Sequence, residues 1–180
     1  MKQGDLSTAF VIKSDMDKNY TTISGYASVF NIIDKHNDKL LKGAFAKVTA
    51  DKVKLLWQHD PCKPIGVIKY LAEDDHGLKI TAEIDHYLED GKKIAALVKQ
   101  KAINGLSIGF IIKSYNHDNK GVRLIDNVEL MEISIVTFPA NQEASIQEVK
   151  NFNTKDLALI DEVNLNNLII TTARLDHFFN

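Results

Sequence analysis

The sequence has little cysteine and little proline: Cys62 stands alone, and only 3 prolines occur in 180 residues. A single cysteine excludes an internal disulfide framework and a zinc site built from several cysteines of one chain, and it fits a reducing compartment. The apolar runs are short, since none reaches the roughly 18 residues of a membrane span. The N-terminus also lacks the apolar core of a signal peptide. We therefore expect a soluble, cytoplasmic protein.

Positive and negative charges nearly balance, and the formal net charge is -2 at pH 7. Without a basic excess, nothing favours nucleic acid or an anionic membrane as a partner. The hydrophobic share of 44% and the charged share of 26% are ordinary for a globular protein. A chain of this length buries about 70% of its unfolded surface, so its core needs no disulfide or metal.

Strand-like segments rich in β-branched and aromatic residues dominate the chain. The expected strands are 9–14, 20–31, 53–60, 65–73, 78–85, 106–115 and 122–137, and the expected helices are 43–51 and 89–103. About seven strands with few helices predict a mainly β (α+β) fold, either an antiparallel barrel or a sandwich with helices at its margin. From residue 151 the chain becomes polar and rich in asparagine, so we expect one main domain at 1–150 and a C-terminal helix or extension at 151–180.

The segment 53–60, VKLLWQHD, ends an apolar row with a histidine. If this segment is one strand, Trp57 and His59 share a face and Asp60 points the other way. An imidazole with a pKa near about 6.5 is the usual general base at neutral pH. A core histidine bonded to a backbone carbonyl would give the same pattern, so this segment alone leaves both interpretations open.

The segment 105–109, GLSIG, places Ser107 between two glycines on one strand face. The missing side chains leave room for a substrate backbone to approach a nucleophile, although glycines in a strand can also mark close packing or a bulge. The same letters fit the nucleophile elbow of an α/β-hydrolase, with Asp126 and His177 completing the order. That elbow requires a helix after the serine, whereas the residues that follow Ser107 are strand-like.

The segment 128–136 is apolar on both faces of a strand, and Glu132 interrupts it. A buried carboxylate is costly unless it is hydrogen-bonded or paired. A histidine N–H is a natural partner, and holding that ring is the third role of a catalytic triad. Backbone donors, Arg123 or a lysine are equally good partners on this evidence.

Seven motifs occur in a specific order along the chain: GYASVFN at 25–31, KGAF at 42–45, LWQHD at 56–60, PIG at 64–66, GL at 77–78, GLSIGF at 105–110 and EISIVTFPAN at 132–141. This ordered set resembles the prohead proteases of tailed bacteriophages over about residues 20 to 150. That family is similar in fold to the herpesvirus assemblins. The resemblance therefore implies a single antiparallel β-barrel ringed by a few helices.

The resemblance also implies roles for individual residues. Ser107 matches the family's nucleophile and His59 its base, while Glu132 falls where assemblins carry a second histidine. The backbone N–H of Ala140 or Asn141 stands where assemblins place oxyanion-stabilising arginines. The implied function is a serine endopeptidase that works without cofactor or metal.

The same resemblance implies where this activity would act. The substrates would be the scaffold region of the major capsid protein and the protease itself, with self-cleavage within or near the polar stretch 151–167. The place would be the interior of the prohead in the host cytoplasm. A homodimer is expected only by analogy with assemblins.

Two other interpretations of the chain stay open. One is a non-catalytic assembly or scaffold protein that keeps the barrel, and the other is an esterase of the α/β-hydrolase type, with the nucleophile elbow considered above. The alternating Asp34, His36 and Asp38 suggest a metal site, but hard-cation sites usually recruit more carboxylates, so we expect a solvated loop there.

Overall fold

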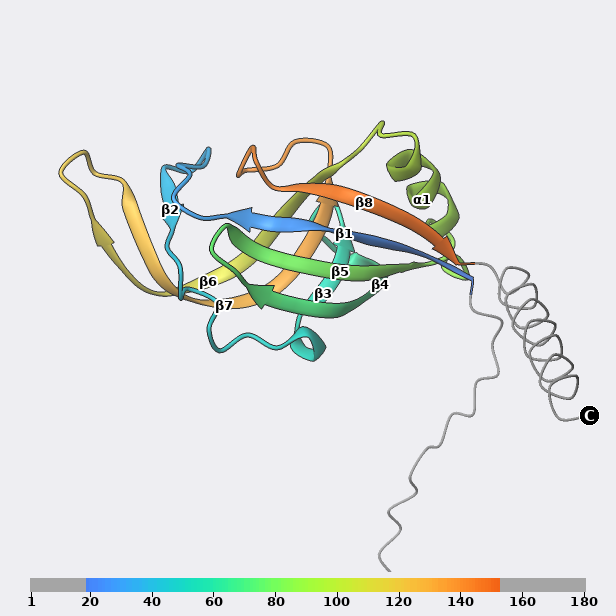
Figure 1. Cartoon of the computed structure of the whole chain (residues 1–180), viewed down its shortest axis with the longest axis horizontal. Coiled ribbons are helices and arrows are strands. Elements are labelled where there is room, and N and C mark those ends of the chain that lie inside the picture. The colour runs from blue at the N-terminus through green and yellow to red at the C-terminus, as the bar shows by residue number, and fades with distance from the viewer. Residues whose placement is uncertain (1–18, 153–180) are drawn as a thin grey trace, which may run out of the picture.

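The structure, a computed structural model, describes residues 19–152, and its strands wrap around a common core (Figure 1). The strands are β1 (Tyr20–Val29), β2 (Asp38–Leu40), β3 (Lys54–Trp57), β4 (Asp60–Glu73), β5 (Gly77–Asp85), β6 (Gly105–His117), β7 (Arg123–Val136) and β8 (Ser145–Phe152). One α-helix, α1 (Gly91–Lys99), and one 3-10 turn, η1 (Ala50–Lys52), complete the described part. The expected strand 9–14 and residues 153–180 of the expected extension lie outside it.

The eight strands form one sheet in the order β2-β7-β3-β4-β5-β1-β8-β6, and pairing of β6 with β7 closes all of them except β2 into a barrel. β3 runs parallel to β7, whereas the other neighbours around the barrel are antiparallel. The expectation of a purely antiparallel barrel is therefore wrong. Strands that alternate in direction around a closed ring of odd number must leave one neighbouring pair parallel, and β3 with β7 is that pair.

The core of the barrel is built from alternating inward residues, as the strand patterns predict. Ile23, Ile80, Leu106, Ile133 and Ile135 are fully buried. The barrel also closes between the ends of β6 and β8, where Gly105 pairs with Ser145. Figure 1 shows β6 and β7 continuing past the barrel as a long hairpin.

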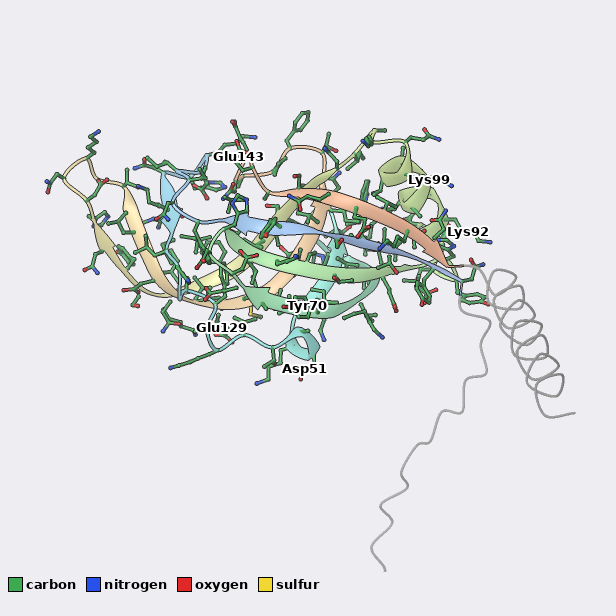
Figure 2. The ribbon with its side chains drawn as sticks, viewed as in Figure 1. Asp51, Tyr70, Lys92, Lys99, Glu129 and Glu143 are labelled. Atoms are coloured by element: carbon green, nitrogen blue, oxygen red, sulfur yellow. The ribbon has the colours of Figure 1, made fainter. Side chains whose placement is uncertain are left out.

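The helix expected over 89–103 is present as the shorter α1, which packs against β5. Its buried stripe contains Ile94 and Val98. Figure 2 shows Lys92 and Lys99 directed away from the barrel, so charged residues occupy the outer side of this helix. The barrel is thus bordered by one α-helix within residues 19–152, not ringed by several.

The helix expected over 43–51 is wrong, because the chain forms successive turns there before η1. The backbone carbonyl of Ala44 accepts a hydrogen bond from Val128 N instead of from its own segment. The carboxylate of Glu73 accepts the N–H groups of Gly43 and Phe45. Contacts from distant strands therefore pair backbone groups of this segment, including Ala44 O, which a helix would have paired locally.

Two strands were not expected from the sequence. β8 pairs with β1 from Tyr26 to Tyr20, and it runs to Phe152, two residues past the expected domain limit at 150. β2 pairs in parallel with the start of β7. β2 begins at Asp38, which is buried and paired with Arg123, so the expectation of a solvated loop is wrong for this residue.

Candidate active site

One face of the β6–β7 ladder gathers the polar residues of the site. Ser107 lies opposite Ser134, and Gly109 lies opposite Glu132. Residues directly opposite in an antiparallel ladder share a face, and alternate residues of one strand do too. The intervening Leu106 belongs to the core. The alternation expected around Ser107 and Glu132 therefore places both side chains on the side of the ladder that faces away from the barrel interior.

His59 does not continue β3, as the sequence pattern had suggested. The strand ends at Trp57, and Gln58 and His59 adopt positive φ angles of 52° and 60° in a turn that leads into β4. Consecutive non-glycine residues rarely adopt this left-handed conformation, so the turn needs external support. Ile135 O accepts the N–H of Gln58 at 3.0 Å, and Ser134 Oγ accepts the N–H of His59 at 3.0 Å.

The turn brings the imidazole of His59 onto Glu132. Nδ1 of His59 lies 2.6 Å from Oε1 of Glu132, while Oε2 of Glu132 accepts a hydrogen bond from Ser134 Oγ at 2.7 Å. The side chain of His59 is 44% exposed, and that of Glu132 is 12% exposed. A nearly buried carboxylate thus has both oxygens paired, and it fixes the orientation of a ring that substrate can still reach.

Gly109 makes room for this carboxylate. A Cβ atom at position 109 would lie 2.3 Å from Oε1 of Glu132, too close for any side chain. The glycine was expected to leave room for a substrate backbone, but in the structure the carboxylate of Glu132 occupies the space that a side chain at position 109 would need. Ser134 was also missed as a functional residue, although a second polar residue two positions after Glu132 in an apolar strand was a visible signal.

Ser107 is nearly buried and lines a cavity of about 90 Å³ together with Ala140 and Asn141. The side chain of Asn141 is held by the scaffold, since its Nδ2 donates to Val29 O at 2.8 Å. The structure thus brings the expected nucleophile and the expected oxyanion donors to one cavity. Between Ser107 and His59 no hydrogen bond is present in the described structure, which is common before substrate binds.

The remaining candidates lie elsewhere. Asp60 accepts the backbone N–H of Cys62 at 2.9 Å, so its carboxylate belongs to its own turn. Asp126 accepts a hydrogen bond from Ser114 on the distal part of the β6–β7 hairpin, and His177 is outside the described residues. β6 continues as a strand to His117, so the strand-to-helix turn of an α/β-hydrolase elbow is missing after Ser107.

The acidic loop before β2 is organised by its own backbone. Asp34 Oδ1 accepts the N–H groups of His36 and Asp38 at 2.8 and 2.9 Å. Within residues 19–152 there is no group of three histidine, cysteine or acidic side chains that could hold a metal ion. In the same range no helix is long and apolar enough to cross a membrane.

The family model for caudovirus prohead serine proteases matches residues 8–158, which include the whole described barrel and the site. The chain belongs to this family. The expected resemblance is therefore confirmed, and this prohead serine protease family member carries the His59–Glu132 pair and Ser107 within the matched range.

Individual relatives agree with this assignment. The prohead protease of Enterobacteria phage HK97 is 33% identical over 147 residues, covering 78% of this chain and 65% of that protein. A capsid polyprotein of Pseudomonas phage PAJU2 is 32% identical over 127 residues, covering 66% of this chain and 18% of that protein. This family member therefore spans slightly less than two thirds of the first relative and a small part of the second.

The fold also has a counterpart among solved structures. A crystal structure of Kaposi's sarcoma herpesvirus protease in complex with a hexapeptide phosphonate inhibitor superposes with a TM-score of 0.54 at 13% identity, over 73% of this chain and 65% of that one. At this identity the similarity shows the fold alone. It confirms the expected likeness to the herpesvirus proteases.

Proposed function

We propose that this chain is a serine endopeptidase of prohead maturation in which Ser107 is the nucleophile, His59 the general base and Glu132 the residue that orients the base. The observation that supports it most is the 2.6 Å contact between His59 Nδ1 and Glu132 Oε1, made on the face of the β6–β7 ladder that carries Ser107. A carboxylate, an imidazole and a serine hydroxyl in this relation are the parts of a catalytic triad.

The contact to Glu132 determines which nitrogen of His59 reacts. A proton on Nδ1 is donated to the carboxylate, which leaves the lone pair of Nε2 available. Nε2 takes the proton of Ser107 as Oγ attacks the peptide carbonyl carbon, and it then gives that proton to the leaving amine. Water, activated by the same nitrogen, hydrolyses the acyl-enzyme and restores Ser107. These steps use no cofactor or metal.

The negative oxygen formed by this attack needs hydrogen-bond donors. We assign that role to the backbone N–H of Ala140 or Asn141, because both residues line the cavity that Ser107 lines. Their loop is anchored, since Lys35 N donates to Ala140 O and the side chain of Asn141 bonds β1. Donors held rigidly at the position of developing charge stabilise the transition state.

Capsid proteins are the proposed substrates, because one relative is named a prohead protease and another is named a capsid polyprotein. On this proposal the chain cuts the scaffold region of the major capsid protein inside the prohead, in the host cytoplasm. It also cuts itself, and it acts as a homodimer by analogy. β8 is paired with β1 as far as Phe152, so the self-cleavage site falls after residue 152, where a cut leaves the barrel strand whole.

Co-expression with the neighbouring capsid protein, followed by mass spectrometry of the products, tests this function. Wild-type chain should shorten the capsid protein and lose its own C-terminal residues. Ser107→Ala should leave both full length, because loss of a triad nucleophile costs on the order of 10⁶ in turnover. Ser114→Ala is the matched control, since Ser114 lies on the same strand but bonds Asp126 instead of lining the cavity.

The outcomes separate the proposed function from its alternative. Near-wild-type processing by Ser107→Ala would refute this active site. Capsids that assemble normally with uncut precursor, in wild type and Ser107→Ala alike, would instead identify a non-catalytic assembly protein.

A further inference from the structure

Another pocket, of about 300 Å³, lies along β7 beyond the active site, between that strand and the segment that leads into η1. Its apolar lining comes from both sides, with Val48 on the segment and Val128 and Leu130 on the strand. Figure 2 shows Glu129 of β7 and Asp51 of η1 along the same edge of the molecule. The volume is that of a small binding pocket and accommodates several side chains of a peptide.

Positive charge is in excess around this pocket, which we call the basic pocket. Lys47, Lys52 and Lys113 line it, against a single acid, Glu129, which pairs with Lys113. Lys47 and Lys52 are exposed, and within residues 19–152 neither forms an ion pair. Asp51 adjoins Lys52, but a neighbouring threonine already hydrogen-bonds its carboxylate. Two lysines beside apolar surface are therefore available to an acidic, apolar partner.

The basic pocket lies on the same outward face of the β6–β7 ladder as the active site. Ile111 is opposite Glu129 on this ladder, and Glu129 is three residues from Glu132, or about 10 Å along the strand. Ile111 and Met131, both about half-exposed, cover the face between the two sites. An extended peptide with its scissile bond at Ser107 would therefore reach the basic pocket with residues about four positions or more from that bond.

The chain itself contains a segment with matching chemistry. Residues 156–163, DLALIDEV, combine three acids and five apolar residues without a base. They follow soon after Phe152, in the stretch to which the proposed function assigns self-cleavage. The segment lies outside the described residues, so the match rests on its sequence: its acids suit the lysines, and its apolar residues suit the lining.

The direction of β8 favours a second copy of the chain as the source of this segment. Ser145 at the start of β8 pairs with Gly105, two residues before Ser107, and the eight-residue strand ends at Phe152, about 23 Å away. β6 runs antiparallel to β8, and Figure 1 shows the end of β8 and the β6–β7 hairpin at opposite ends of the barrel. The four residues from Phe152 to Asp156 span at most about 14 Å, so the start of the segment falls short of the basic pocket of its own chain.

We propose that the basic pocket binds residues 156–163 of a second copy of this chain, with Lys47 and Lys52 pairing their acids, and so presents a nearby bond to Ser107. Self-cleavage is then the hydrolysis described above, with one copy as enzyme and the other as substrate. This inference rests on the proposed protease function. Charge pairs at such a surface speed the encounter and fix the register of the bound segment.

Mixing two distinguishable chains tests this proposal. A tagged full chain carrying Ser107→Ala cannot cut itself and serves as substrate, and intact mass spectrometry follows the loss of its C-terminal residues. Wild type should shorten it at a rate proportional to enzyme concentration. Lys47→Glu with Lys52→Glu in the enzyme should lower this rate about tenfold. Lys92→Glu with Lys93→Glu, at two exposed positions of α1, makes the same charge change and should keep the wild-type rate.

Reversing the charges on the substrate makes the experiment decisive. Asp161→Lys with Glu162→Lys in the substrate should slow cutting by wild type about tenfold, since the lysines of the pocket then face like charges. The enzyme with both lysines of the pocket reversed should cut this substrate within about threefold of the original rate, because opposite charges meet again. Added salt should lower the rate of the original pair, since it screens exposed charges. Circular dichroism checks that each variant is folded.

Equal rates for wild type and the reversed enzyme on the original substrate, or no recovery in the swapped pair, would overturn the proposal. So would self-cleavage of wild type at a rate independent of its concentration while the Ser107→Ala chain stays uncut, because the reaction would then occur within one chain. Failure of the proposed function looks different: wild type would then cut neither itself nor the capsid protein in a manner that depends on Ser107.

Discussion

The hydroxyl of Ser134 joins the backbone of His59 to the carboxylate of Glu132. Its oxygen accepts the N–H of His59 at 3.0 Å, and its hydrogen is donated to Oε2 of Glu132 at 2.7 Å. One fully buried side chain therefore holds both the left-handed turn that carries the proposed base and the carboxylate that orients it. The accuracy of the proposed triad depends on this bridge as much as on its own members.

Ser134→Ala should reduce kcat by about 10- to 100-fold with little change in KM, because a misplaced base slows chemistry more than binding. Ser134→Thr, which keeps a hydroxyl, should recover part of the loss. Single-turnover cleavage by folded protein measures the effect. A loss confined to thermal stability, with kcat unchanged, would show that Ser134 acts only in packing.

Glu132→Gln should reduce turnover by roughly 10² to 10⁴, because an amide at this position can favour the wrong tautomer of the histidine. Asp60→Asn should have a far smaller effect, since the amide oxygen can still accept the N–H of Cys62. Both variants are compared on one capsid peptide. The reverse order, with Asp60→Asn inactive and Glu132→Gln active, would mean that Glu132 is merely structural.

Gly109→Ala should lower activity by about 10²-fold, because the new Cβ occupies the position of Glu132 Oε1 and forces the carboxylate away from His59. A double-mutant cycle on stability isolates the cause. The alanine should destabilise wild type but cost much less in a Glu132→Ala background. An equal cost in both backgrounds would locate the strain in the strand backbone.

His86 provides a pH prediction at the other end of the barrel. Its ring contacts Thr21 and Asn19, and burial, followed by the charge of Lys92, lowers the pKa of His86. The unfolded chain then binds this proton more readily. The stabilising effect of the neutral ring is therefore present above about pH 6.5 and is lost as the pH falls below that value towards the folded pKa.

Between pH 7.5 and 5.5 the melting temperature of wild type should fall about 1 to 2 °C more than that of His86→Gln, a small difference because the ring is only partly buried and solvent screens it. Thermal unfolding followed by circular dichroism at both pH values measures it. Equal decreases in melting temperature in the two proteins would show that groups other than His86 cause the loss of stability at low pH.

The sequence by itself determined the strands whose residues alternate clearly. Around Ser107 and Glu132, polar and apolar residues alternate with period two, so the pattern indicated which side chains share a face and that Glu132 needed a partner. The order of the short motifs identified the family, because the identity and order of the motifs can be read from the sequence without knowing the fold. The local pattern did not decide which group pairs with Glu132: a histidine, a backbone donor, an arginine or a lysine.

Only the tertiary structure decided what Glu132 touches. His59 and Glu132 are 73 positions apart, and they meet because β3 runs parallel to β7 and ends in a turn that no periodic pattern encodes. Gln58 and His59 adopt their left-handed conformation because Ile135 and Ser134 bond their N–H groups. Likewise Ser28 turns towards the core only because β1 bulges against β5. Strand pairing between distant segments fixes these positions, and its energy comes from contacts that local sequence does not contain.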